Sequence, residues 1–178
     1  MMKAQAEQEV ISLRVDKDFF FRNDIDSPIP PSERSNFKGL NYFPPDDRNR
    51  VTSKPERFDT PKPIMIATST GNRQAYMGYG AFTFEIEGRS LKLIVYKSAV
   101  DPYARSLFIP FSDETSGRET YAAGRYLDLE EQGGDDYELD FNMAYNPYCA
   151  YSEEYTCPLR PAENKLPVRI MAGEKNYK

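Results

Sequence analysis

Apolar and polar residues alternate along the chain from residue 63 onward, and this period of two is typical of β-strands that bury one face. The clearest case is a β-hairpin, which the alternating runs at 82–86 and 91–95 predict on either side of a turn at Glu87–Ser90. The glycines of YMGYG, Gly78 and Gly80, predict a β-bulge. Further strands are predicted at 64–68, 107–111, 125–129, 137–141 and 166–170.

Short turns rather than helices separate these runs, which favours an antiparallel sheet over a parallel one. Several strands with one apolar face must fold back on themselves to bury that face. We therefore expect a mainly β fold, either an antiparallel β-barrel or a two-layer β-sandwich. A single domain is expected over residues 1–178, with its β body at 63–172.

Two segments precede the β body. Residues 4–22 are rich in helix-forming residues and predict an N-terminal α-helix that ends before Ser27-Pro28. Residues 27–63 hold most of the 14 prolines. A long segment without regular structure is uncommon in a compact domain. We therefore expect this Pro-rich segment to wrap around the body, held by aromatic side chains such as Phe43 and Phe58.

The composition excludes several functions. With no His and two Cys, the chain cannot form a Ser-His-Asp triad, an HExxH zinc site or a four-thiolate cluster by itself. Its net charge is -5 and it has no stripe of Lys or Arg, so we expect neither nucleic acid nor an anionic membrane surface as a partner. No cofactor or metal site is expected, and a homo-oligomer is not predicted.

The N-terminal sequence bears on location. MMKAQAEQEVISLRVDKDFF carries scattered charges and lacks the apolar region of a secretory signal. No run approaches the roughly 18 apolar residues of a transmembrane helix. The expected location is the cytoplasm, and the alternative is export, with a leader removed before this numbering begins.

The first polar segment, FSDETSGRETYAAGRYLDL at 111–129, interrupts the strand pattern. Its Asp, Thr, Ser and Gly residues favour a capped turn. Arg125 shares the inward parity of Leu127 and Leu129, and a buried guanidinium requires a carboxylate or a bound anion. A structural ion pair is one interpretation, and a ligand anion held by Arg125 is the other. The carboxylates considered for the ion pair are Asp113, Glu119 and Glu163.

The second polar segment is DFNMAYNPYCAYSEEYTCPLRPAEN at 140–164. Its Asp and Asn side chains offer oxygens to a polar ligand, although the spacing of an EF-hand is absent. Its tyrosines form either covered core or a surface that stacks on a sugar or base. These tyrosines are Tyr145, Tyr148, Tyr151 and Tyr155.

Cys149 and Cys157 do not have the CxxC spacing of redox or zinc motifs. Buried free thiols, expected in the cytoplasm, and a disulfide both fit this spacing, because a strand–turn–strand can bring the two close together. A nucleophilic Cys would need a Lys, an Arg or a helix N-terminus to stabilise its thiolate, since the chain has no His.

The two polar segments resemble the signature stretches of a bacterial and archaeal family known as domain of unknown function 1684. SPIP and FKGLNYFP in the N-terminal half fit the same family, as does the run from Asn142 to Asn164. The resemblance implies no activity that can be carried over. It does imply that some relatives are exported, which favours the disulfide.

Three functions fit these observations. The first is a small-molecule binding domain whose pocket, formed by 113–128 and 140–164, takes an anionic or polar ligand. The second is a hydrolase or lyase without His, with Asp113 or Asp140 as base and Arg125 stabilising an anion. The third is an architectural polar core with no ligand. The ligand-binding residues predicted for the first are Arg118, Tyr121, Arg125, Asn142, Tyr145, Asn146 and Asn164.

Overall fold

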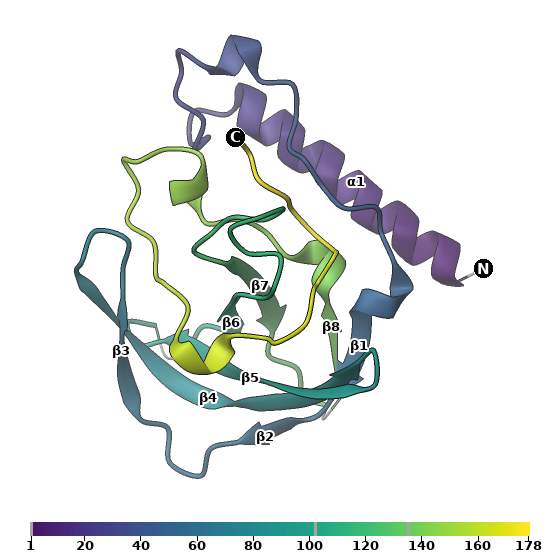
Figure 1. Cartoon of the computed structure of the whole chain (residues 1–178). Coiled ribbons are helices and arrows are strands. Elements are labelled where there is room, and N and C mark those ends of the chain that lie inside the picture. Colours follow the sequence, from purple (N-terminus) through teal and green to yellow (C-terminus); the bar gives the residue numbers. More distant parts are fainter. Residues whose placement is uncertain (1, 102, 135) are drawn as a thin grey trace.

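The computed structural model describes residues 2–101, 103–134 and 136–178, and it is mainly β with one N-terminal helix, α1, at Met2–Asn23 (Figure 1). The strands are β1 (Arg50–Ser53), β2 (Pro55–Arg57), β3 (Pro63–Ala67), β4 (Arg73–Ile86), β5 (Arg89–Ser98), β6 (Ser106–Phe111), β7 (Arg125–Glu130) and β8 (Tyr137–Asp140). Short 3-10 helices are η1 (Arg34–Asn36), η2 (Asp47–Asn49), η3 (Phe141–Met143), η4 (Tyr148–Ala150) and η5 (Ala162–Asn164).

All strand pairs are antiparallel, as the short turns predicted. A six-stranded sheet follows the order β2-β4-β5-β6-β7, with β3 also paired to β4, and a separate two-stranded sheet joins β1 to β8. Among the described residues, β7 does not pair with β2 or β3, so the sheet is not closed into a barrel. The arrangement is sandwich-like, with the inner face of the large sheet covered by β1, β8 and the C-terminal segment.

The predicted hairpin is β4–β5. Ile86 pairs with Arg89, so the turn consists of two residues, Glu87 and Gly88, shorter than the expected Glu87–Ser90. Both have positive φ, 52° and 74°, which is the conformation of a type I′ turn and which glycine adopts readily. The predicted bulge is also present, because the register with β5 shifts between Gly78 and Gly80.

The main core lies between the large sheet and the segments that cover it, and it includes Phe82, Leu93, Ile109 and Phe141, all fully buried. The predicted strand at 166–170 is wrong: apart from single bridges, the described chain from 165 to 172 is irregular. The predicted alternation of buried and exposed side chains is nevertheless present, because Leu166, Val168 and Ile170 are all buried in the core.

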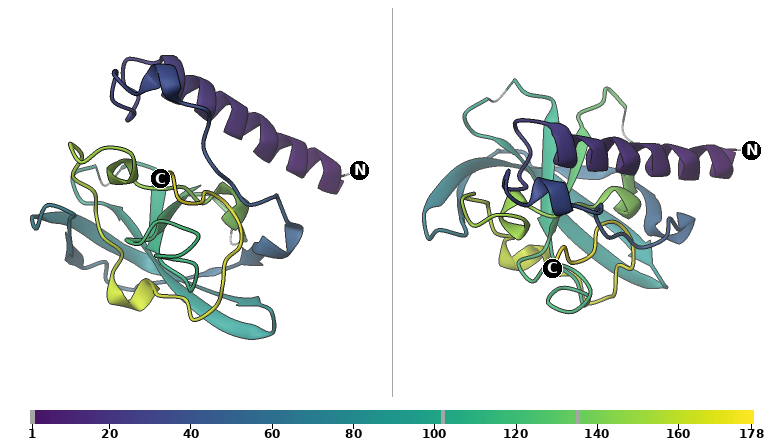
Figure 2. Two further views of the ribbon diagram at one scale, coloured as in Figure 1. Left: turned by 45° about the horizontal axis from the view of Figure 1, so that its top comes forward. Right: turned by 90° about the horizontal axis from the view of Figure 1, so that it is seen from above.

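The Pro-rich segment wraps the body as expected, but it also contributes β1 and β2, which the sequence pattern did not reveal. Figures 1 and 2 show α1 and the chain that follows it on the far side of a loop layer from β4 and β5. A second apolar cluster of Phe21, Ile29, Phe37 and Tyr151 joins α1 to these loops. No helix among the described residues is long and apolar enough to cross a membrane.

Candidate functional site

The two polar segments singled out in the sequence lie side by side. Tyr126 and Tyr145 exchange two backbone hydrogen bonds of 2.8 and 3.0 Å, which joins β7 to the start of the second segment. The N–H of Ser112 donates to the carbonyl oxygen of Asn164 over 3.0 Å, which joins the first segment to the end of the second. The two predicted segments are therefore neighbours in space.

Arg125 is buried, 1% exposed, and its Nη2 lies 2.8 Å from Oδ2 of Asp113. Its terminal nitrogens also donate to the carbonyl oxygens of Ile170, at 2.9 Å, and of Ala172 and Glu174. Burial lowers the pKa of Arg125, and the negative charge of Asp113 opposes that shift. Both terminal nitrogens already donate hydrogen bonds to oxygens of the protein. A role for Arg125 as a ligand anchor therefore has no support in the structure.

The amides of two predicted asparagines, Asn142 and Asn164, form hydrogen bonds to distant backbone groups. The amide of Asn164 accepts from the N–H of Ile94 and donates to the carbonyl oxygens of Ile94 and Pro110, each at 2.8 Å. In the same way the amide of Asn142 accepts from the N–H of Asp46 over 2.9 Å and donates to its carbonyl oxygen over 3.0 Å. Each asparagine amide thus supplies the hydrogen bonds that the backbone of a neighbouring strand would supply if regular strand pairing continued.

The other predicted residues are dispersed. Asn146 donates to the carbonyl oxygen of Lys175 over 2.9 Å, and its buried Oδ1 has no hydrogen-bond partner among the described residues. Arg118 is exposed, and Tyr121 is partly buried beside the turn that ends at Gly124. Asp140, proposed as a base, accepts from Arg50 over 2.7 Å and caps η3.

Glu174 is a buried charged residue that the site prediction did not include. It is 1% exposed, and its carboxylate accepts from the N–H of Asn146 over 2.9 Å and from the hydroxyl of Tyr151. Lys17 of α1 supplies the opposite charge. These contacts could not be predicted from the sequence, because each partner lies more than 20 residues from Glu174 along the chain.

A recess of about 300 Å³ lies where the two polar segments meet, and we call it the tyrosine recess. It is lined by Tyr126, Tyr145, Pro147, Tyr148, Tyr155, Thr156, Cys157 and Pro158. Tyr145 was a predicted ligand-binding residue. Tyr148 and Tyr155 were recognised as part of an aromatic cluster, whereas Tyr126 was missed, although its outward parity beside Arg125 places it on the outer face of β7.

The rings of the recess contact one another edge to face. Tyr126 and Tyr145 have centroids 5.7 Å apart, and Tyr148 and Tyr155 have centroids 5.1 Å apart. The hydroxyl of Tyr126 donates to the carbonyl oxygen of Pro158 over 2.5 Å, and that of Tyr145 donates to Asp128 over 2.5 Å. Burial raises the pKa of Tyr126 and of Tyr145 well above the ordinary value, so both phenols are neutral at physiological pH.

A disulfide supports one wall of the recess. Cys149 and Cys157 are bonded, with sulfur atoms 2.12 Å apart, so the expectation of free thiols is wrong. The bond closes the loop that carries Tyr151 and Tyr155. The N–H of Cys157 also donates to the hydroxyl of Ser69 over 3.1 Å, which anchors this loop to the turn after β3.

No metal centre is evident in the part of the chain that the structure describes: no group of three or more Cys, Asp or Glu side chains is placed to hold an ion. Asp113 and Asp140, the two candidates for a catalytic base, each have an arginine partner, and neither lines the tyrosine recess.

Comparison with known proteins identifies relatives of this chain. The family model described as "Protein of unknown function (DUF1684)" matches residues 35–175, which include both polar segments. The solution NMR structure of an uncharacterised protein from Haloarcula marismortui is similar, with 39% sequence identity and a TM-score of 0.75, over 97% of this chain and 95% of that one. No curated protein matches the chain. On the family match and the identity to this relative, the chain belongs to the DUF1684 family of proteins of unknown function.

Proposed function

We propose that this protein binds a small polar molecule, a neutral saccharide, in the tyrosine recess. The observation that carries the proposal is a recess with four tyrosines in its lining and no charged side chain. The flat face of an aromatic ring packs against the C–H face of a sugar, while the phenol hydroxyls and Thr156 offer hydrogen bonds to sugar hydroxyls.

The charge of the lining supports a neutral ligand over an anionic one, the two ligand classes expected from the sequence. An anionic ligand needs Arg or Lys donors, and Arg125 is committed to protein oxygens while neither Lys nor Arg lines the recess. A neutral ligand requires no such donor. The same lack of cations at the recess argues against a nucleic acid strand as its occupant.

The size and exposure of the recess suit one or two sugar units. A volume of about 300 Å³ lies at the small end of ligand pockets. Tyr148 is 37% exposed, so the face of its ring is accessible for stacking. The disulfide restrains the segment that carries Tyr155, which lowers the entropy lost when a ligand binds.

The test is titration of the protein with neutral oligosaccharides of glucose, galactose and N-acetylglucosamine, followed by NMR shifts of recess amides and by calorimetry. Tyr148→Ala and Tyr155→Ala should each weaken binding about tenfold, equivalent to about 1.4 kcal/mol. Tyr103→Ala is the matched control, because Tyr103 is 93% exposed and lies outside the recess, and it should leave binding unchanged.

Two results would contradict the proposal. One is the absence of saturable shifts at recess amides with any of these saccharides at millimolar concentration. The other is binding that Tyr148→Ala, Tyr155→Ala and Tyr103→Ala all leave unchanged. Either result would favour the architectural interpretation of this region.

The disulfide bears on where the protein works. Disulfides persist in oxidising compartments and are rare in the cytoplasm, so the bond between Cys149 and Cys157 supports export over the cytoplasmic location expected from the N-terminal sequence. Alkylation of free thiols at the moment of cell lysis, followed by mass spectrometry, should leave both cysteines unmodified. Alkylation of both would support the cytoplasm.

A further inference from the structure

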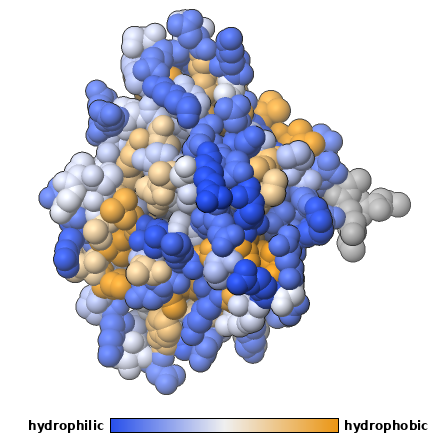
Figure 3. Space-filling view, viewed as in Figure 1, coloured by the Kyte–Doolittle hydropathy of each residue, from blue (hydrophilic) through white to orange (hydrophobic). Residues whose placement is uncertain are grey.

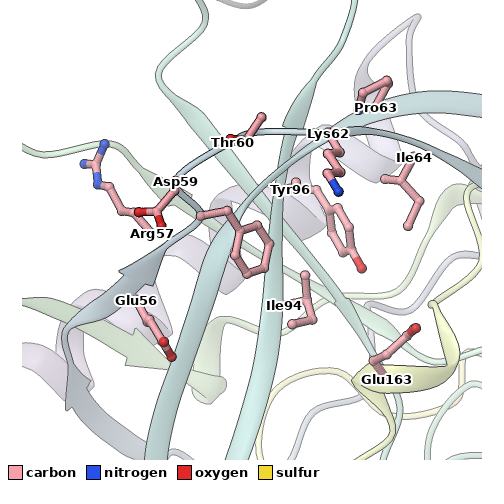
Figure 4. Close-up of a pocket in the computed structure, with 12 residues that line it drawn as sticks. Glu56, Arg57, Asp59, Thr60, Lys62, Pro63, Ile64, Ile94, Tyr96 and Glu163 are labelled. Carbon is pink, nitrogen blue, oxygen red and sulfur yellow. The ribbon is translucent and has the colours of Figure 1, made fainter.

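A second, larger groove lies on the outer face of β4 and β5, and we call it the loop 58–62 groove. Its volume is about 760 Å³, within the usual range of small-molecule sites. The loop between β2 and β3 forms one side and η5 supplies Glu163 on another (Figure 4). It shares no lining residue with the tyrosine recess.

The bulge in β4 creates this groove. Both β2 and β3 pair with the same edge of β4, on either side of the bulge, so loop 58–62 must arch across it. The loop is tied at both ends: the N–H of Phe58 donates to the carbonyl oxygen of Tyr79 over 3.2 Å, and that of Gly78 donates to Lys62 over 3.1 Å. Gly80 is required here, because a Cβ would lie 2.5 Å from the carbonyl oxygen of Glu56.

The groove has an apolar interior. Ile94 and Tyr96 of β5 form its floor, and Phe58 and Ile64 contribute from the loop side. In Figure 4, Ile64 and Ile94 flank the ring of Tyr96. A ligand that fills the groove therefore gains by placing an apolar body against these side chains.

Tyr96 supplies an unpartnered polar group inside the groove. The residue as a whole is 2% exposed, and its phenol oxygen lies at the open side of the groove without a hydrogen bond to any residue that the structure describes. Figure 4 shows this phenol and the carboxylate of Glu163 directed into the same space. Burial, reinforced by the negative charge of Glu163, raises the pKa of Tyr96 to about 12, so the phenol is neutral. Phenol and carboxylate together can accept hydrogen bonds from a cationic donor.

The charges of the groove favour a cation. Three carboxylates line it, those of Glu56, Asp59 and Glu163, and none forms an ion pair with a described residue. Arg57 is directed away, 3.2 Å from Glu131 and over the ring of Tyr79. Lys62 is the remaining cation of the lining, and its side chain is exposed.

We propose that the loop 58–62 groove binds a primary ammonium compound with an apolar body. The ammonium group lies between the Glu163 carboxylate and the Tyr96 phenol, and the apolar body covers Phe58 and Ile94. The ammonium head group gives the specificity. A carboxylate in its place would be repelled by Glu163, and a hydroxyl would leave Glu163 without a charged partner.

The test compares three probes with the same ring and different head groups: 2-phenylethylamine, 2-phenylethanol and phenylacetate. We expect saturable NMR shifts at the amides of Gly78, Ile94 and Glu163 with the amine, and binding at least tenfold weaker with the other two. Glu163→Gln, an exposed and isosteric change, should weaken amine binding about tenfold, equivalent to about 1.4 kcal/mol. Tyr96→Phe keeps the ring and should weaken it severalfold.

Control variants make the test decisive. Glu153→Gln and Tyr103→Phe make the same chemical changes at exposed positions outside the groove and should leave amine binding unchanged. Lys62→Met removes a repelling cation and should bind the amine at least as tightly.

Four results would overturn the proposal. They are the absence of shifts at the amides of Gly78, Ile94 and Glu163, equal binding of the three probes, an unaltered affinity in Glu163→Gln, and weaker binding in Lys62→Met. Shifts confined to amides of Tyr148 and Thr156 would place the amine in the tyrosine recess and overturn it as well.

Discussion

Arg125 shows how a single buried side chain organises the C-terminal segment. Its guanidinium holds the carbonyl oxygens of Ile170, Ala172 and Glu174, which alternate along the chain as they would in a strand. The planar fork of an arginine can satisfy several acceptors at once. The segment is therefore fixed with its apolar side chains inward, although in the described part of the chain it pairs with its neighbours only through single bridges, at Lys165 and Glu174.

The ion pair between Asp113 and Arg125 gives a prediction at the scale of one residue. Asp113→Asn keeps the shape of the side chain but leaves the arginine buried without a counter-charge. The free energy of unfolding should fall by about 3–5 kcal/mol, as measured by urea denaturation. Glu130→Gln is the control, because Glu130 is exposed and lies 3.5 Å from Arg105, and it should change stability far less. A fall of under about 1 kcal/mol in Asp113→Asn would show that the pair is not structural.

At the scale of elements, α1 is held to the body by one face. Phe21 is 1% exposed and contacts the ring of Tyr151 edge to face at 5.0 Å, and Lys17 on the same side pairs with Glu174. The opposite side carries exposed apolar residues, including Val15 and Phe19. In Figure 3, orange hydrophobic surface is interspersed with blue on the face of the molecule shown in Figure 1. Packing on the body rather than helix propensity therefore holds α1 in place.

Two neighbouring phenylalanines test this anchoring. Phe21→Ala should lower the free energy of unfolding by about 3–5 kcal/mol, because it leaves a cavity in the apolar cluster. It should also speed amide hydrogen exchange along α1. Phe19→Ala makes the same chemical change at a position that is 69% exposed, and it should alter stability by under about 0.5 kcal/mol. Equal effects of the two changes would mean that α1 is not docked through Phe21.

At the scale of the whole molecule, a row of aromatic rings runs across the outer face of the large sheet. Tyr96, Tyr76, Phe108, Tyr126 and Tyr145 follow one another with centroid separations of 4.7–6.4 Å. The loop 58–62 groove includes the first of these rings, and the tyrosine recess includes the last two. The outer face thus has its own apolar layer, with an opening at each end of the row.

This burial of tyrosines predicts how the whole protein responds to alkali. Burial raises the pKa of Tyr96 to about 12, and it also raises the pKa of Tyr126, Tyr145 and Tyr151 well above the ordinary value. The folded state then holds protons that the unfolded state loses near pH 10. Stability contributed by the neutral phenols is therefore complete below about pH 10 and falls as the pH rises toward 12.

Urea denaturation between pH 8 and 11.5, with absorbance at 295 nm to follow tyrosinate, measures this loss. Part of the 13 tyrosines should titrate near pH 10, whereas Tyr96, Tyr126, Tyr145 and Tyr151 should titrate only as the protein unfolds. A single titration of all tyrosines near pH 10 with unchanged stability would contradict the burial described for them.

Local sequence patterns were enough to predict several elements of this fold. Alternation located β3, the last part of β4, β5 to β8 and the inward position of Arg125. Helix-forming residues located α1, and two glycines located the bulge. Side-chain parity and helix period are set by a residue and its near neighbours along the chain. That is why these predictions succeeded without knowledge of the fold.

Which strands pair, and which groups the polar side chains bind, could be learned only from the folded chain. β1 and β2 lie in a Pro-rich segment and exist because β8 and β4 offer them edges. Asn142 and Asn164 were predicted to bind a ligand. The sequence does not show whether a side-chain amide forms its hydrogen bonds with a ligand or with a backbone segment far away along the chain. The tyrosine recess and the loop 58–62 groove are likewise formed by segments far apart in the chain, and long-range packing alone brings such segments together.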